Sequence, residues 1–382
     1  MSTPVSTPVS TPVSTPVSTP VSTPDARLPV AVLGATGAVG QTFIRLLEGH
    51  PWFRLAEVAA SERSAGQRYA DATRWIEGAM PASAAALMVT TCDTTVVKSP
   101  IVFSALDASA AAALEPAFAS SGRFVLSNAK HFRMERDVPL VIPEVNASHL
   151  ALLALQGARG WTGGVVTNAN CAVTVAALAL APLHERFVVK EVFLSTMQAV
   201  SGAGYPGVPS LDILGNVIPF IGDEEGKLES EMQKILGRMS GGALQHATFV
   251  VSAHANRVAV EHGHTLTCSV RFERKPSLGE ALDVLRAWRG APEVQGLPSA
   301  PERALVVTDA PDRPQPRRDV MAGNGMSVTI GRVREDRIFD LRFVAMGHNT
   351  IRGAAGGSIL NAEVLAATGR LPGGWRPPAS TR

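Results

Sequence analysis

Short runs of β-branched residues alternate with apolar stretches of helical spacing over the first part of the chain. This alternation is typical of a parallel sheet flanked by helices. We therefore expect a doubly wound α/β domain here. The predicted strands are Val30–Leu33, Leu55–Ala59, Ile101–Ser104, Arg123–Leu126 and Leu140–Ile142, and the predicted helices between them are Ala38–Glu48 and Ala108–Ser120.

The pattern changes after Asn146, where longer β-rich runs predict a mixed sheet in a second, α+β domain. These runs are Val188–Val200, Phe249–Val260, Thr265–Glu273 and Ser327–Phe343. The Pro- and Arg-rich stretch 300–318 is expected to be a long excursion between strands, and the helical run 349–369 is expected to pack back on the first domain. The predicted division is a tail over 1–24, a first domain over 25–147 completed by 348–382, and a second over 148–347.

The tail repeats Ser-Thr-Pro-Val almost perfectly from Ser2 to Pro24. Such a tract cannot bury enough apolar area to offset its ordering entropy, so we expect it to be disordered, and it lacks the features of a secretory signal. A docking segment is the alternative interpretation.

Composition excludes several classes of partner. The 382 residues contain 18% charged residues and carry a net charge of +2, which gives no basic field for nucleic acid or an anionic membrane. No run is apolar enough for a membrane span. Three widely spaced cysteines without a CxxC pair indicate neither a metal site nor a disulfide framework, and a cytoplasmic location fits best.

A glycine-rich turn, Gly34-Ala-Thr-Gly37-Ala-Val-Gly40, follows the first predicted strand and opens a helix. Glycines at such a turn allow close approach of a pyrophosphate, whose charge lies at the helix N-terminus. The turn therefore predicts a Rossmann-like dinucleotide site in which Gly34, Thr36, Gly37, Ala38 and Val39 contact the cofactor. Its spacing is GxxGxxG rather than GxGxxG, and glycines of a plain tight turn are the alternative.

The end of the second predicted strand indicates which dinucleotide binds. Hydroxyls and a guanidinium at Ser61, Arg63 and Ser64 suit the 2′-phosphate of NADP, because Arg forms charge-assisted bonds with phosphate. Glu62 leaves open an NAD-type contact with the ribose.

Cys171 lies where a β-branched stretch turns through Asn168 and Asn170 into an apolar helical run. A helix N-terminus favours the thiolate of a cysteine whose free pKa is about 8.5. A nucleophile is the sharper interpretation, and an inert buried cysteine is the alternative.

With these motifs and several further strings, the chain resembles the aspartate-β-semialdehyde dehydrogenase family, most closely its archaeal and fungal branch. The resemblance runs from about Pro29 to about Gly369. It departs from the branch at Ala169 and Ala172, where Pro and Ser are usual. The strings are Ser127-Asn-Ala-Lys-His-Phe-Arg133, Val138-Pro-Leu-Val-Ile-Pro-Glu144, Asn170-Cys171, Ser201-Gly-Ala-Gly-Tyr-Pro-Gly207, Asn256-Arg257-Val258, Gly263-His264-Thr265, Arg313-Pro-Gln-Pro-Arg317 and Ala322-Gly-Asn-Gly-Met326.

The resemblance implies a role for each residue that matches a family motif. Cys171 would be the nucleophile, His264 the acid and base, Gln198 the group that orients the carbonyl, and Asn170 with the Cys171 N–H the oxyanion donors. By the same resemblance Arg257 would bind the substrate carboxylate and Glu224 its amino group. Lys227 and Arg133 would bind the phosphate. The further cofactor contacts that the resemblance implies are Ser104, Ser201, Gly202 and Asn349. Without the resemblance, His264 would be interpreted as a structural histidine, Arg257 as a surface arginine and Gln198 as an exposed strand residue. Glu224 and Lys227 would be interpreted as a solvated pair. Arg257 and His264 have opposite strand parity, so they share a pocket only if a turn near residues 261–263 redirects the chain.

The implied reaction is NADPH-dependent reductive dephosphorylation of β-aspartyl phosphate to aspartate semialdehyde through a Cys171 thioester, in aspartate-family amino-acid biosynthesis. The implied partners are a small acyl phosphate or aldehyde and phosphate, with a homodimer or homotetramer as the assembly. A malonyl-CoA reductase, an N-acetylglutamyl-phosphate reductase and a non-catalytic NADP-binding protein are the alternatives.

Overall fold

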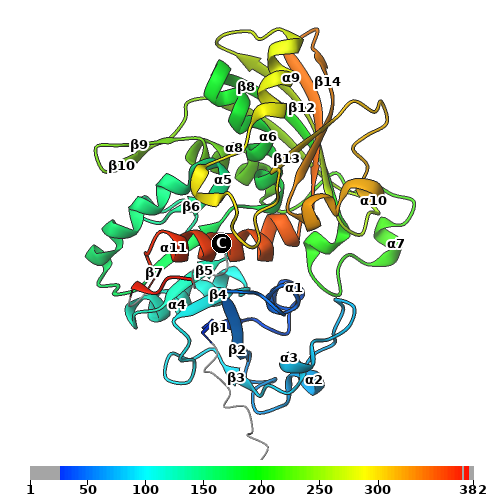
Figure 1. Cartoon of the computed structure of the whole chain (residues 1–382). Coiled ribbons are helices and arrows are strands. Elements are labelled where there is room, and N and C mark those ends of the chain that lie inside the picture. Colours follow the sequence, from blue (N-terminus) through cyan, green and yellow to red (C-terminus); the bar gives the residue numbers. More distant parts are fainter. Residues whose placement is uncertain (1–25, 372–373, 378–382) are drawn as a thin grey trace, which may run out of the picture.

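The computed structural model describes residues 26–371 and 374–377 and contains two large sheets. Figure 1 shows the sheet built from the N-terminal strands below and the second sheet above, with α11 running between them. The repeat tail lies outside the described residues. In the part of the chain that is described, no helix is long and apolar enough to cross a membrane.

The first sheet has seven strands in the order β3-β2-β1-β4-β5-β7-β6, and all its pairings are parallel. Their carboxyl ends therefore lie along one edge, as in other doubly wound domains. The strands are β1 (Leu28–Leu33), β2 (Phe53–Ala60), β3 (Val89–Thr91), β4 (Ile101–Ser104), β5 (Phe124–Ser127), β6 (Leu140–Val141) and β7 (Gly164–Asn168).

The second sheet has six strands in the order β11-β8-β12-β15-β14-β13 and mixes parallel with antiparallel pairs. A separate hairpin pairs β9 with β10. The strands are β8 (Val189–Gln198), β9 (Arg238–Ser240), β10 (Ala243–Gln245), β11 (Val250–Arg257), β12 (His264–Phe272), β13 (Leu305–Thr308), β14 (Val328–Glu335) and β15 (Leu341–Gly347). Together the two sheets confirm the expected fold class.

Helices cover both sheets. Asp107 caps α4 by accepting from the N–H groups of Ser109 and Ala110, which explains why that helix begins where the sequence predicts. The helices are α1 (Ala38–Leu47), α2 (Tyr69–Ala72), α3 (Ala82–Ala85), α4 (Ala108–Ser120), α5 (Pro143–Asn146), η1 (Ala147–Arg159), α6 (Cys171–Phe187), η2 (Val200–Ala203), α7 (Ser210–Ile213), α8 (Glu224–Ile235), α9 (Leu278–Ala287), η3 (Pro292–Val294), α10 (Pro316–Asp319), η4 (Ala322–Gly325), the π-helix η5 (Ile351–Ala355) and α11 (Gly356–Ala367).

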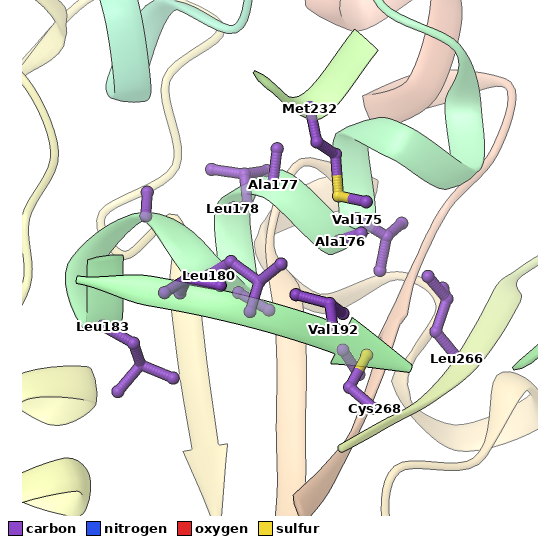
Figure 2. Packing of buried hydrophobic residues seen from close by; sticks show 14 of the residues in the cluster. Val175, Ala176, Ala177, Leu178, Leu180, Leu183, Val192, Met232, Leu266 and Cys268 are labelled. Carbon is purple, nitrogen blue, oxygen red and sulfur yellow. The ribbon is translucent and has the colours of Figure 1, made fainter. Parts of the chain in front are cut away.

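The central helix of the second half is α6, which is apolar around its whole circumference. A helix of this kind is stable only when it is buried on all sides. Figure 2 shows its side chains, such as Leu180, packed against Val192 of β8 and Cys268 of β12, with Met232 of α8 also in the cluster. This packing fixes the N-terminus of α6, where Cys171 lies.

The C-terminal helix α11 packs its apolar side chains into the same core as β1 and β4 of the first sheet. The sequence predicted this return. The parallel sheet also includes β7 at 164–168, so it extends past residue 147, where we placed the end of the first domain. The domain boundaries themselves stay predictions.

Two segments differ from the expected elements. The run 327–343 is not one strand but parts of β14 and β15, joined by a turn in which the Asp336 N–H donates to the Asp340 carbonyl. The excursion over 300–318 contains β13 and the short helix α10. The alternation of apolar and polar residues did not predict the turn near Asp336 or the edge strand β13, because both are short.

Candidate active site

Three side chains meet in one row across neighbouring strands of the mixed sheet. Arg257 pairs with Gln198, and Thr265 pairs with Met197, so His264 comes next to Gln198 on the other side. All three side chains are buried, on the face that packs against the helices. Residues 258–263 redirect the chain between Arg257 and His264, which is the condition that their sequence parity required.

The candidate nucleophile begins helix α6 directly after β7. Asn170 is its N-cap, and its side-chain oxygen accepts from the N–H groups of Ala172 (3.0 Å) and Val173 (3.1 Å). This cap leaves Cys171 in the first turn of the helix, half-buried. The predicted helix N-terminus is therefore present.

The protonation of Cys171 differs from the prediction. Burial, and next the Glu224 carboxylate, raise the pKa of its thiol to about 12. Arg133, the Ala172 N–H and Arg257 act in the opposite direction but are weaker. This arrangement does not favour the thiolate expected at neutral pH, because the sequence could not reveal that the thiol is buried and that the charge of Glu224 acts on it.

His264 is buried with a defined ring orientation. Its Nδ1 accepts from the Ala199 N–H at 3.1 Å, so in the neutral ring Nε2 carries the hydrogen. That Nε2 is buried without a partner among the described residues. Burial, and next the charge of Arg257, lower the pKa of His264 to about 3, so the ring is a neutral donor at physiological pH.

Arg257 is tied to the same segment. Its Nη1 donates to the Ala199 carbonyl at 2.8 Å. A Cβ added at Gly202 would lie 2.8 Å from that Nη1 and 3.3 Å from the His264 Nε2. Gly202 therefore leaves space beside both groups.

Glu224 joins several of the predicted residues. Its carboxylate accepts from the Asn170 side-chain amide (2.8 and 3.0 Å), from Gln198 (3.1 Å) and from Lys227 (2.8 Å). Burial works against its charge, but Lys227 and these hydrogen bonds outweigh burial and hold the pKa of Glu224 below its usual range. Glu224 and Lys227 thus belong to one hydrogen-bond network with Asn170 and Gln198 and are not a solvated pair.

Arg133 lies on the loop after β5. Its Nη1 donates to Glu231 at 2.9 Å and its Nη2 to the Asn128 carbonyl at 2.8 Å, while its Nε is buried without a partner in the described chain. Its charge also acts on the Cys171 thiol. The sequence did not reveal Glu231 as a partner.

A cavity of about 580 Å³ lies at the carboxyl edge of the parallel sheet. Of the predicted cofactor residues, Gly34, Thr36, Gly37 and Ser61 line it. A Cβ at Gly34, whose φ is +69°, would lie 2.6 Å from the Ala105 carbonyl, so only glycine fits this turn. Other lining residues that the sequence did not reveal are Thr91, Cys92, Asp93, Ala105, Leu106 and Asp107.

Five further residues predicted on this side of the cofactor lie outside this lining, whereas Glu62, the alternative ribose contact, is part of it. Ala38 and Val39 form the first turn of α1. Glu62 lines the cavity, whereas Arg63 is exposed and outside the lining and Ser64 is buried. Ser104 is wholly buried at the end of β4. Contacts of these residues with a cofactor stay predictions.

The predicted nicotinamide-side residues come together. The Asn349 side chain donates to the Ser201 hydroxyl at 2.8 Å and accepts from the Gly263 N–H at 2.9 Å. Gly202 follows Ser201 in η2. Because Gly263 directly precedes His264, these contacts place Asn349 and Ser201 beside His264.

The segment after α2 and the segment after η2 touch directly. The Arg74 guanidinium lies 5.1 Å from the centre of the Tyr205 ring. Gln41 of α1 donates to the Arg74 carbonyl and to the Thr36 carbonyl, both at 3.0 Å. The loop of the glycine turn is thus connected to the loop that follows Ser201.

Among the described residues, no group of three His, Cys, Asp or Glu side chains is placed to hold a metal ion.

Two family models match the chain. The NAD binding domain of semialdehyde dehydrogenases matches residues 29–153, and their dimerisation domain matches residues 180–352. The aspartate-semialdehyde dehydrogenase of Archaeoglobus fulgidus is 48% identical over 89% of this chain and 98% of its own length. That of Schizosaccharomyces pombe is 45% identical over 90% of this chain and 99% of its own length. The chain belongs to the aspartate-semialdehyde dehydrogenase family.

Solved structures of the family agree with this placement. The aspartate-semialdehyde dehydrogenase with NADP from Candida albicans superposes with a TM-score of 0.83 at 39% identity, covering 90% of this chain and all of that one. The Vibrio cholerae enzyme II complexed with ASA gives a TM-score of 0.71 at 25% identity over 89% of this chain and 98% of that one. The similarity to archaeal and fungal relatives confirms the resemblance found in the motifs.

Proposed function

We propose that this chain reduces β-aspartyl phosphate to aspartate semialdehyde with NADPH and releases phosphate, as a step of aspartate-family amino-acid biosynthesis. The observation that carries the proposal is the position of Glu224 in a chain of this family: its carboxylate accepts from Asn170, which precedes Cys171, and from Gln198, which lies between Arg257 and His264 in the sheet.

Residues around the cavity fit a dinucleotide. The glycine turn is a cradle that a Cβ would fill, and it opens helix α1, whose N-terminal N–H groups suit a pyrophosphate. NADP is the cofactor we assign, supported by the Candida albicans structure with NADP. Gly34, Thr36, Gly37 and Ser61 would hold it at one end, and Ser201, Gly202 and Asn349 at the nicotinamide. Ala38, Val39, Arg63, Ser64 and Ser104 stay further predicted contacts. When bound, NADPH supplies a hydride to the carbonyl carbon.

The substrate contacts follow from charge. Arg257 would bind the carboxylate, because a guanidinium binds two carboxylate oxygens at once. Glu224 would take the amino group, and Lys227 with Arg133 the phosphate. The buried Nε of Arg133 is a donor without an acceptor in the described chain, and an anion would supply one.

The first chemical step forms a thioester at Cys171. Its sulfur attacks the acyl carbon, the C–O bond to phosphate breaks, and the thiol proton leaves with the phosphate as hydrogen phosphate. This route creates no lasting thiolate, which agrees with the raised pKa of Cys171. Gln198 would orient the carbonyl.

In the second step the thioester is reduced and the aldehyde released. The buried Nε2–H of His264 would donate to the oxyanion of the hemithioacetal, with Asn170 and the Cys171 N–H as further donors. Collapse of that oxyanion breaks the C–S bond, and a solvent proton restores the Cys171 thiol.

The decisive experiment is an assay in the oxidative direction. Purified protein with aspartate semialdehyde, NADP and phosphate should give a phosphate-dependent rise in NADPH absorbance. Cys171→Ser should bind NADP with unchanged affinity yet lose nearly all turnover. Activity on malonyl-CoA without activity on aspartate semialdehyde would instead establish the acyl-CoA reductase, and NADP binding with neither activity would establish a binding protein. The relatives favour neither alternative.

We further propose a homodimer formed by the outer face of the mixed sheet. The dimerisation-domain model covers this sheet, and Phe193 (40% exposed) and Val250 (68% exposed) place apolar side chains on that face. Sedimentation should give a dimer, and Phe193→Glu should weaken it; a tetramer would require a second interface. A cytoplasmic location is proposed from the three free thiols.

A further inference from the structure

Helix α8 presents four charged side chains at a spacing of three or four residues. Glu224 and Lys227 belong to the substrate site described above, and Glu231 and Lys234 continue the same face one and two turns later. Glu231 is 2% exposed and Lys234 is fully buried. Charged side chains are rarely buried to this degree unless they have partners.

The two oxygens of Glu231 bind two different parts of the site. Oε2 accepts from the backbone N–H of Asn170 at 2.8 Å, and Oε1 accepts from Nη1 of Arg133 at 2.9 Å. Asn170 is the cap of the helix that begins with Cys171, and Arg133 comes from the loop after β5. One carboxylate therefore joins the nucleophile turn to the guanidinium.

Lys234 fixes the loop on the other side of Arg133. Its ammonium donates to the carbonyls of Arg133 (2.6 Å), Glu135 (2.7 Å) and Val138 (2.8 Å). The backbone of Arg133 is thus held by Lys234 while its side chain is held by Glu231. The helix that carries the substrate-binding pair also determines where Arg133 can lie.

We propose that Glu231 is a positioning residue that sets the distance between the phosphate-binding guanidinium of Arg133 and the nucleophile turn of Cys171. The proposal rests on the function proposed above, in which Arg133 binds the phosphate. Glu231 itself does not touch the reacting atoms. It acts through Arg133 and Asn170, with Lys234 holding the loop.

Glu231→Gln tests this role, with Glu229→Gln as the matched control on the exposed side of the same helix. The variant replaces one of the two carboxylate oxygens by an NH2 group, which donates and cannot accept, so the contact with either Asn170 or Arg133 is lost. We expect the KM for phosphate to rise at least tenfold while the KM for NADP changes less than twofold, and the control to match the wild type. An unchanged KM for phosphate, or equal losses for phosphate and NADP, overturns the proposal.

A double mutant separates positioning from general damage. If Glu231 acts through Arg133, Glu231→Gln combined with Arg133→Gln should match Arg133→Gln alone in phosphate KM to within twofold. Multiplied losses would contradict it. Should Glu231→Gln fail to fold, as judged by near-UV circular dichroism, Glu231→Asp keeps the charge and shortens the reach; a phosphate KM raised at least threefold supports the proposal, and an unchanged one overturns it.

A measurement without turnover distinguishes this proposal from the proposed function. Inorganic phosphate should slow alkylation of Cys171 by iodoacetamide in the wild type, and this protection should be lost in Glu231→Gln. A wild type that shows the protection but no phosphate-dependent turnover would overturn the function alone. A variant that keeps full protection would overturn the positioning role alone.

Discussion

Gly353 of the π-helix η5 lies directly against Cys171. A Cβ added at Gly353 would come 2.6 Å from the Cβ and 2.8 Å from the Cα of Cys171, closer than real Cβ contacts allow. Cys171 can therefore occupy this position only because residue 353 has no side chain.

Gly353→Ala should displace Cys171 and lower kcat at least tenfold, because small shifts of a reacting atom are costly. The KM for NADP should change little. Gly157→Ala, where nothing lies within 4 Å of the added Cβ, is the control. Steady-state kinetics of the two variants make the comparison, and an unimpaired Gly353→Ala would show that the turn can shift without cost.

Gly34→Ala should weaken cofactor binding. The added Cβ meets the Ala105 carbonyl at 2.6 Å, and the φ of +69° is strained for alanine. We expect the dissociation constant for NADP, measured by fluorescence titration, to rise at least tenfold. Gly66→Ala has a similar positive φ of +80° but open space around it, so it isolates the backbone strain from the clash.

Glu115 should make stability depend on pH. Its side chain is wholly buried, with Ser127 donating to it at 2.7 Å, and burial raises its pKa from 4.5 to about 7. Between these two pKa values the folded state binds more protons than the unfolded state. The contribution of Glu115 to the free energy of unfolding is therefore fully present below pH 4.5 and is lost as the pH rises through 7. The loss is about 3 kcal/mol.

Glu115→Gln keeps an acceptor for Ser127 and removes the titration. Urea unfolding at pH 5 and pH 8 should show that the variant gains stability relative to the wild type on going to the higher pH. Glu293→Gln, an exposed glutamate, should show no such gain. A difference between variant and wild type that stays constant with pH would contradict the assignment.

Breaking the Arg352–Glu144 pair should strongly destabilise the fold. Both residues are at most 3% exposed, and their two hydrogen bonds are each 2.6 Å long. Glu144→Ala would leave a buried guanidinium unpaired, and we expect a loss of about 3–5 kcal/mol in the free energy of unfolding. Replacing both residues by Met should cost much less, which urea unfolding will test.

Much of the fold could be predicted from periodicity. Both β4 and α4 have the bounds that the sequence predicted, and Asp107 marks the start of α4 as its N-cap. The glycine turn and Cys171 could be predicted from their place at the start of a helix, whereas the substrate-binding residues and His264 could be found only through family motifs. His264 lies in an ordinary strand pattern, and its role depends on the turn at 258–263.

What the sequence could not give were contacts between distant segments. The pairing of Glu231 with Asn170 and the packing of Gly353 on Cys171 join residues 61 and 182 positions apart. The one available signal for Glu231 was its spacing from Glu224 and Lys227. The direction of the Cys171 pKa shift was missed for the same reason, since it depends first on burial by the surrounding segments and next on Glu224, which comes from another helix.

The contact between Arg74 and Tyr205 has a consequence for cofactor binding. An exposed cation–π contact is worth about 0.5–1 kcal/mol, which shifts an equilibrium only by a factor of about 2 to 5. Arg74 therefore adds little to the attachment of the Tyr205 segment, and Arg74→Ala should leave the KM for NADP within about fivefold of the wild-type value.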